Sequence, residues 1–393
     1  MSSRASSEAF SLSPVKWRSG NASLLSEHGF TPMEAVNTLY AEGQEEFAEA
    51  ILASLSRQVF DADVPLPSGN FRRWMAGGVF RLLRWTTRPT VRTNPDGTEM
   101  TVFRNRIIER SNHPYGMTLL EPSMADAASF VEGGDPMNAP YMMISPEISR
   151  NASTWDNIFL NSVQGKDVQI RFIWECQFSY KGAKSRLDQG KPVHLKAAAA
   201  GTGLSMILVF DRLIRDGYDP RLITATITDR DAGNVTKARR LLNKLHTTSA
   251  HLATTMNGPG ISARTRDLLH PVPEAEAADP PYDVVTLIGI LEYFSGFTCA
   301  TTDEHLGHPA SPAFSNAPEI IGKIRAMTAP SGLLVVNSYK VEIGARILEI
   351  FGKRLYFRRR QEMRALLESG GFAPTGEVGS GIVYDVEVFQ KVP

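Results

Sequence analysis

One segment, residues 193–205, constrains the fold more than any other part of the chain. It runs Val-His-Leu-Lys-Ala-Ala-Ala-Ala-Gly-Thr-Gly-Leu-Ser, which predicts a buried strand that ends in a tight loop at Gly201 and Gly203. Only residues with little or no side chain let the backbone turn sharply and let a ligand approach it closely. An apolar helix pattern follows from Leu204. A strand, a glycine loop and a helix in this order are typical of sites for a phosphate- or nucleoside-sized ligand.

Beyond residue 190, strand-like and helix-like segments alternate. Strands are predicted at 193–199, 222–228, 261–266, 282–288 and 332–337, and helices after residue 204 and at 232–245, 341–351 and 360–369. This alternation predicts an α/β fold, in which a parallel sheet carries helices on both faces. A last apolar stretch, residues 382–390, predicts an antiparallel strand on the outside of the sheet.

The length of 393 residues favours two domains over one. Residues 1–160 predict a mostly helical domain that acts as a lid over the substrate, or as a surface for a homodimer. Within it, Asn94-Pro-Asp-Gly97 is a strong turn signal and predicts a hairpin over residues 90–104. Two further helices are expected at 155–163 and 168–180. Residues 165–393 form the predicted ligand-binding domain.

The composition argues against several classes of function. Basic and acidic residues balance, at 42 each, so no net field draws the chain to nucleic acid or to an anionic membrane. The two cysteines, Cys176 and Cys299, lack metal spacing and a disulfide pattern, and we expect no metal. No secretory signal and no run of about 18 apolar residues is present. We therefore expect a cytoplasmic protein that acts on a small molecule.

Carboxylates follow the second and third predicted strands. Asp229 closes the second strand, where a carboxylate can accept two hydrogen bonds from a ribose diol. Asp231 is predicted to cap the next helix, although the two residues could exchange roles. Asp267 closes the third strand, in the right place to contact an adenine amino group. Taken with the glycine loop, these positions predict a nucleoside-binding sheet.

These motifs resemble those of the class I S-adenosylmethionine-dependent methyltransferases. The resemblance covers about residues 165–393 and lies in the glycine motif at 196–203, the strand-two acid and helix at 229–239, strand four at 281–294, the Pro-Gly turn at 329–336 and the late helix at 358–372. A dinucleotide site fits less well, because bulky Leu204, Met206 and Ile207 stand where a third small residue is needed.

The resemblance implies a Rossmann-like methyltransferase sheet with S-adenosylmethionine as the cofactor. Gly201 and Gly203 would face its methionine part, Asp229 its ribose and Asp267 its adenine. The same resemblance implies that neighbouring residues line the cofactor site, namely Ala199, Thr202, Arg230, Leu268 and Gly289.

One departure from the family pattern affects the methionine end. Family members usually carry an acid early in the glycine motif, where this chain has alanines at 197–200. Arg186, before the first strand, could instead pair with the methionine carboxylate, although a solvated basic helix end is an equal alternative. Tyr180 and Tyr293 are candidates to stabilise the sulfonium through their ring faces. Several histidines could act as a base, namely His113, His194, His305 and His308.

The leading expectation is methyl transfer to a small molecule. A second is cyclisation, in which the methionine amine attacks its own γ-carbon and expels methylthioadenosine; the resemblance extends in part to such azetidine-2-carboxylate synthases. The absent motif acid and the long N-terminal region favour this alternative somewhat, because an enzyme without a second substrate needs a sealed, dry pocket. Aminocarboxypropyl transfer to another acceptor is a close relative. A non-catalytic binding scaffold is the third alternative.

Overall fold

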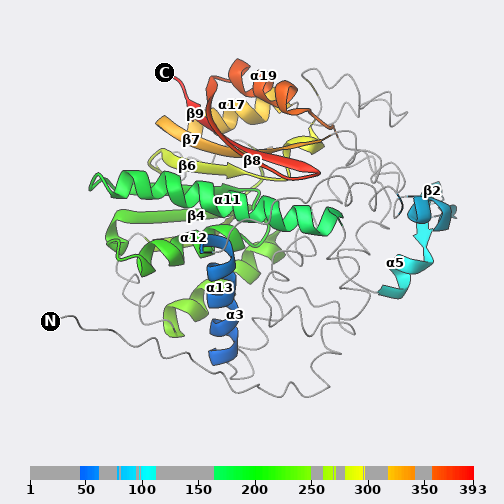
Figure 1. Cartoon of the computed structure of the whole chain (residues 1–393), viewed down its shortest axis with the longest axis horizontal. Helices are drawn as coiled ribbons and strands as arrows, with labels where there is room; N and C mark the ends of the chain where they lie inside the picture. Colours follow the sequence, from blue (N-terminus) through cyan, green and yellow to red (C-terminus); the bar gives the residue numbers. More distant parts are fainter. Residues whose placement is uncertain are drawn as a thin grey trace.

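The computed structural model describes residues 45–61, 78, 81–93, 97, 99–111, 163–248, 260–268, 270, 279–294, 296, 317–340 and 356–393. Within these ranges, no helix combines the length and the apolar character needed to cross a membrane. Elements outside the main sheet are α3 (Glu45–Phe60), β1 (Thr87–Thr93), β2 (Glu99–Asn105) and α5 (Arg106–Ser111). β1 and β2 pair antiparallel, which confirms the predicted hairpin, and Figure 1 shows β2 and α5 at the periphery, away from the main sheet.

Seven strands form one sheet in the order β5-β4-β3-β6-β7-β9-β8. Their bounds are β3 (Val193–Ala198), β4 (Ile223–Asp229), β5 (Gly260–Thr265), β6 (Tyr282–Leu287), β7 (Thr328–Tyr339), β8 (Phe372–Ser380) and β9 (Tyr384–Lys391). The first five strands of this order run parallel. The five predicted parallel strands and the Rossmann-like α/β fold are therefore confirmed.

The sequence predicted that the last strand lies on the outside of the sheet, and the structure shows that it does not. β9 pairs with β7 on one side and with β8 on the other, so β8 is the outer strand. The sequence of β8, Phe-Ala-Pro-Thr-Gly-Glu-Val-Gly-Ser, has neither the alternation nor the β-branched content that predicts a strand. Pairing with β9 therefore decides its conformation.

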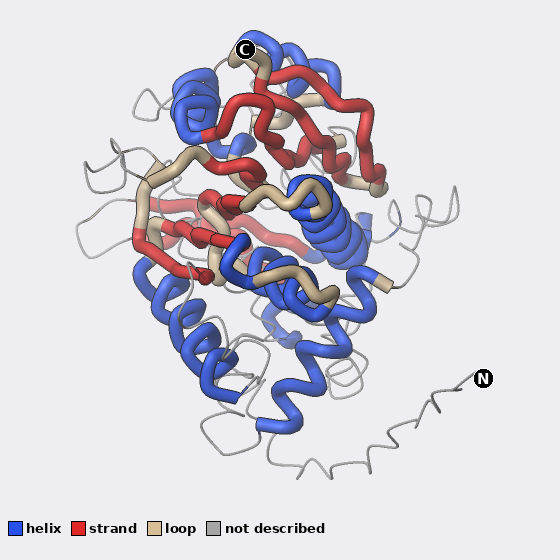
Figure 2. Tube along the Cα trace, turned by 90° about the vertical axis from the view of Figure 1, so that its left-hand side faces the viewer, coloured by secondary structure: helices blue, strands red, loops and turns tan. Residues whose placement is uncertain are grey.

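Helices cover both faces of the sheet, and Figure 2 shows the red strands between two groups of blue helices. The elements between strands are α11 (Val163–Leu187), α12 (Leu204–Arg215), η3 (Pro220–Leu222), α13 (Ala232–Thr248), η5 (Leu291–Tyr293), α17 (Ala317–Met327) and α19 (Arg360–Ser369). α11, α12 and α13 share one apolar core with β3 and β4, and α17 and α19 share a second core with β6 and β7.

α11 contains the helix that the sequence predicted at 168–180, whereas the helix predicted at 155–163 falls almost entirely outside the described residues. α11 extends to Leu187. α3 packs on α11, where the Gln177 side-chain amide donates a hydrogen bond to the Val59 carbonyl at 2.7 Å. Part of the N-terminal 160 residues thus belongs to the same packed layer as α11 and α12.

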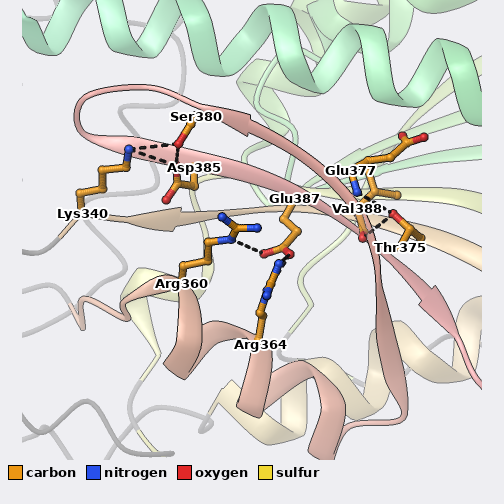
Figure 3. Close-up of polar contacts among 9 residues, drawn as sticks. All are labelled: Lys340, Arg360, Arg364, Thr375, Glu377, Ser380, Asp385, Glu387 and Val388. Carbon is orange, nitrogen blue, oxygen red and sulfur yellow. Dashed lines mark hydrogen bonds and ion pairs between the residues drawn. The ribbon is translucent and has the colours of Figure 1, made fainter. Parts of the chain in front are cut away.

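α19 is fixed to β9 by charge pairs as well as by its apolar side. Glu387 of β9 has a side chain that is only 5 % exposed. Its carboxylate accepts from Arg360 Nε at 3.3 Å and from Arg364 Nε at 2.7 Å (Figure 3). The hairpin of β8 and β9 is also bonded to Lys340, which follows β7. Lys340 Nζ lies 3.2 Å from Asp385 Oδ1 and also contacts Ser380 (Figure 3). These contacts define the outer end of the sheet, away from the glycine loop.

Candidate functional site

The loop after β3 has a left-handed backbone at three positions. The φ angles are 50° at Ala199, 58° at Gly201 and 66° at Gly203. A Cβ on Gly203 would lie 2.5 Å from a methyl carbon of Ile227, so both the conformation and the packing require glycine there. Gly203 also begins α12 without a side-chain cap. The loop therefore presents backbone N–H groups at a helix N-terminus, which favours anionic and polar ligands.

The strand order places this loop at the switch point of the sheet. β3 pairs with β4 on one side and with β6 on the other. The chain therefore first adds β4 and β5 on one side of β3 and then crosses to add β6 on the other side. Open α/β sheets bind ligands in the crevice at such a point, beyond the carboxyl ends of the strands. We call this side of the sheet the carboxyl edge, and the opposite side the amino edge.

Asp229 joins the end of β4 to the glycine loop. Its Oδ2 accepts a hydrogen bond from the Gly201 N–H at 2.7 Å, and its Oδ1 accepts one from the Asp231 N–H at 2.8 Å. Burial raises the pKa of Asp229, and these two backbone hydrogen bonds oppose that rise. Each carboxylate oxygen can accept more than one hydrogen bond, so Asp229 can hold the loop and still receive a ligand hydroxyl.

Asp231 has the separate role that the sequence predicted. Its Oδ1 accepts hydrogen bonds from the N–H groups of Gly233 at 2.5 Å and Asn234 at 3.1 Å, in the first turn of α13. The helix-cap prediction is therefore confirmed, and Asp229 and Asp231 do not exchange roles.

Other residues implied by the resemblance also lie at the carboxyl edge. Asp267 and Leu268 follow β5 and line a pocket with Lys196, Arg266 and His270. The other lining residues, Asp279, Tyr282, Lys323 and Met327, lie before or at the start of β6 and in α17, so this pocket extends from the end of β5 toward the amino edge. Gly289 follows β6, and its N–H donates to Asn337 Oδ1 at 2.6 Å. Ala199, Thr202 and Arg230 lie in the β3 loop and directly after β4. The structure thus places the glycine loop, Asp229, Asp267 and Gly289 at one edge of the sheet.

α11 contributes two buried ionisable side chains, Arg171 and Glu175, near the glycine loop. Their exposed fractions are 5 % and 6 %, and they stand one helical turn apart. The Ser205 hydroxyl, in the first turn of α12, donates to Glu175 Oε1 at 2.7 Å. Burial raises the pKa of Glu175; hydrogen bonds from Ser205 and Thr286 and the positive charge of Arg171 oppose this rise.

The guanidinium of Arg171 reaches the segment after β6. A Cβ on Gly289 would lie 3.5 Å from Arg171 Nη1, and the guanidinium carbon lies 4.7 Å from the ring centroid of Tyr384. The Tyr384 hydroxyl is 2.6 Å from the Tyr339 hydroxyl. Burial raises the pKa of both tyrosines well above the usual value, so both stay neutral at physiological pH.

Glu292, in η5, is a second buried carboxylate near the same guanidinium. Burial raises its pKa, and the charge of Arg171, a hydrogen bond with Asn337 and the charge of Arg358 lower it in part. One guanidinium, Arg171, thus acts on two buried carboxylates, Glu175 and Glu292. Buried charges of this kind are costly unless they are balanced.

Arg358 holds the segment after β6 in place. Its side chain is 1 % exposed, and it donates to the carbonyl oxygens of Leu291, Phe294 and Gly296 at 2.7, 2.7 and 2.6 Å. These bonds satisfy carbonyl groups that no regular ladder pairs, and they fix η5 with Glu292 and Tyr293 against the carboxyl edge.

Two residues that the sequence assigned to the site lie at the other side of the sheet. The Tyr180 hydroxyl donates to Asp216 Oδ2 at 2.5 Å, beyond the last turn of α12. Arg186 Nη2 lies 3.2 Å from Asp283 Oδ1, and Asp283 Oδ2 accepts from the His194 N–H at 2.9 Å. Because α11 continues to Leu187, its second half descends to the amino edge. Segment 180–186 and His194 thus lie at the amino edge, away from the glycine loop, which argues against their predicted roles toward the ligand.

Tyr293, the other predicted aromatic, lies in η5 and packs against both cores. Three of the histidine candidates, His113, His305 and His308, lie outside the described residues. The sequence analysis missed Arg171, Glu175, Glu292 and Arg358. A signal for the first two was present, because α11 places Arg171 and Glu175 among Ile170, Phe172, Ile173 and Cys176, and charges inside an apolar helix stretch are rare unless they are partnered.

No protein-family model and no curated protein matches the chain. Among solved structures, a "possible exported protein" from Bordetella parapertussis is 13% identical over 88% of this chain and 97% of that chain, with a TM-score of 0.42. The 1,6-didemethyltoxoflavin-N1-methyltransferase of Burkholderia thailandensis is 15% identical over 60% and 87%, with a TM-score of 0.34. The N-methyltransferase NodS of Bradyrhizobium japonicum is 14% identical over 56% and 97%, with a TM-score of 0.32. At these values the similarities carry no argument, and the fold rests on the strand order.

Proposed function

We propose that this chain is an S-adenosylmethionine-dependent transferase that acts on a small molecule, most simply by methyl transfer. The observation that carries the proposal is the pair formed by the left-handed glycine loop and Asp229, whose carboxylate accepts from the Gly201 N–H at 2.7 Å. A carboxylate that is anchored at the switch point and keeps acceptor capacity matches the ribose hydroxyl groups of an adenosyl ligand.

The fit of this cofactor depends on the chain's own donors and acceptors. Asp229 would receive the ribose hydroxyls, and Asp267 and Leu268 would flank the adenine. The bound cofactor would supply an electrophilic carbon next to its sulfonium. The chain would orient the acceptor in line with that carbon and exclude water, since such a displacement needs little other help. Tyr293 would contribute a ring face near the sulfonium.

Cyclisation is the second candidate, and the buried carboxylates of the site favour it. In this reaction the amine nitrogen of the methionine chain forms a bond to the γ-carbon, the carbon–sulfur bond breaks, and methylthioadenosine leaves. The amine must first give up a proton, and Glu175 or Glu292 would take it. Aminocarboxypropyl transfer to a separate acceptor differs only in the identity of the attacking nucleophile.

Incubation with S-adenosylmethionine alone separates these reactions. Methylthioadenosine without an added acceptor would support cyclisation. S-adenosylhomocysteine formed only with an acceptor would support methyl transfer, and methylthioadenosine formed only with an acceptor would support aminocarboxypropyl transfer. Binding without any product would leave a scaffold role.

Asp229→Ala tests the cofactor site itself. We expect this change to weaken S-adenosylmethionine binding by about 1–3 kcal/mol, as for lost hydrogen bonds to a charged group, measured by isothermal titration calorimetry. Asp216→Ala, at the far end of α12, is the control and should leave the affinity unchanged. Equal affinities of the wild type and Asp229→Ala would remove the ribose assignment.

A further inference from the structure

The glycine loop lacks an acid, but the structure places one beside it from another element. Ala197 of β3 is paired in register with Thr286 of β6, and Thr286 hydrogen-bonds Glu175. Ser205, which also bonds Glu175, stands two residues after Gly203. The Glu175 carboxylate therefore lies between Ser205 at the start of α12 and Thr286 of β6, the strand neighbour of Ala197.

The small side chains of residues 197–200 make room for Glu175. Ala197 faces the same apolar core as α11 and α12 and is fully buried. A longer acidic side chain at that position would compete with Glu175 for the same buried space, because protein interiors are close-packed. The alanines of the loop and the glutamate of α11 are thus two halves of one arrangement, although they are distant in sequence.

Glu175 shares a cation with another buried carboxylate. Arg171 acts on both Glu175 and Glu292, whereas Arg358 acts on Glu292. Buried carboxylates are stable as anions only when cations or hydrogen bonds balance them. A ligand that brings an ammonium group to the glycine loop would place a further positive charge beside Glu175.

We propose that Glu175 receives the α-ammonium group of the cofactor's amino-acid end, in place of the acid that the glycine loop lacks. This inference rests on the proposed function, since it assigns one end of the same ligand. Arg171 is a positioning residue: it is one turn from Glu175 and packs against Tyr384 and Gly289, and it fixes the carboxylate toward the loop. The site then selects an adenosyl amino acid over an adenosine thioether without the amino-acid end.

The test compares two ligands that differ only at this end. S-adenosylhomocysteine carries the ammonium and carboxylate groups, and methylthioadenosine carries neither. In titration calorimetry with the full-length chain, Glu175→Gln should lower the affinity for S-adenosylhomocysteine by about 10- to 100-fold, as for a charge-assisted hydrogen bond. Its affinity for methylthioadenosine should stay within about two-fold of the wild-type value, because that ligand cannot reach the carboxylate with a cation.

Glu387→Gln is the matched control, because Glu387 is also a buried, arginine-paired carboxylate but lies at the outer end of the sheet (Figure 3). It should leave both affinities unchanged. An equal loss for both ligands in Glu175→Gln would show a structural role and overturn the inference, and so would no loss for either ligand. If the wild type bound neither ligand, the proposed function would fail instead.

A crystal structure of the S-adenosylhomocysteine complex gives a test that needs no variant. We expect the ligand's amino nitrogen within about 3 Å of a Glu175 carboxylate oxygen, the usual length of a charge-assisted hydrogen bond. A ligand whose amino group is bound only by loop carbonyl groups, with Glu175 still enclosed by Ser205 and Thr286, would overturn the inference.

Discussion

The two ends of α11 carry similar residues but serve different purposes. Its first half lies at the carboxyl edge, where Asp167 accepts backbone hydrogen bonds from Ile382, Val383 and Tyr384 at 2.6–2.7 Å. Its second half lies at the amino edge, where Arg186 contacts Asp283. At the carboxyl edge both Arg171 and Glu175 are buried, whereas at the amino edge Asp283 is buried but its partner Arg186 is 38% exposed. The position of a charged residue along one helix therefore decides how far both partners of a pair are removed from water.

Substitution of a glycine at each edge should give the largest difference in stability between the two edges. Gly203→Ala places a Cβ 2.5 Å from an Ile227 methyl carbon at a φ of 66°. Left-handed strain and overpacking each cost about 1–3 kcal/mol, so we expect the free energy of unfolding to fall by about 2–5 kcal/mol in urea titrations. Gly190→Ala, at the amino edge, has a φ of 70° but no atom within 4 Å. It should cost only about 1–2 kcal/mol, and equal losses would contradict the packing argument.

The next effect is a pH dependence of opposite sign at the two edges. Burial raises the folded-state pKa of Glu292 above its usual value of 4.5, so the folded protein binds more protons than the unfolded chain between these two pKa values. Wild-type stability from this group is then highest at low pH and falls as the pH rises through the folded-state pKa. Relative to the wild type, Glu292→Gln should therefore gain melting temperature as the pH rises above the usual carboxyl pKa.

Asp219, before β4 at the amino edge, provides the comparison for that measurement. Hydrogen bonds from Arg221 lower the pKa of Asp219 below its usual value of 3.8. Its contribution is therefore present above that value and is lost as the pH falls, so Asp219→Asn should lose melting temperature relative to the wild type at neutral pH. Thermal melts of both variants across the same pH range check the two signs. If the melting temperatures of both variants changed in the same direction at neutral pH, the proposed difference between the two edges would be wrong.

The smallest effect should come from the amino-edge ion pair. The Arg186 side chain is 38% exposed, so solvent screens its interaction with Asp283. Arg186→Met should cost less than about 1 kcal/mol of stability and should leave S-adenosylmethionine affinity unchanged. Titration calorimetry of this variant, with Asp229→Ala as the positive comparison, measures both. A clear loss of affinity would restore Arg186 to the ligand site.

Much of the parallel sheet and its loop could be predicted from local patterns. The structure confirms the apolar strands, the left-handed backbone at Gly201 and Gly203, and the helix cap formed by Asp231. Each of these is a short-range property of the sequence. The order of strands also brought Asp229 and Asp267 to one edge, as expected, because the carboxyl ends of parallel strands meet there. The roles given to these residues toward a cofactor stay predictions.

Other parts of the molecule could not be predicted in this way. β8 forms only because β9 pairs with it, and Arg358 finds its carbonyl partners more than 60 residues earlier in the chain. Because α11 continues beyond Tyr180 to Leu187, Arg186 lies about three helical turns past Glu175, at the amino edge. Each of these outcomes depends on a partner that is remote in sequence, so no local pattern reports it.

By itself, the sequence determined which segments become strands and where the backbone must carry glycine, because steric and hydrophobic demands act within a few residues. Only the tertiary structure decided which charges meet. Glu175 meets Ser205 and Thr286 because packing brings α11 against α12 and β6, and no property of these residues alone requires it.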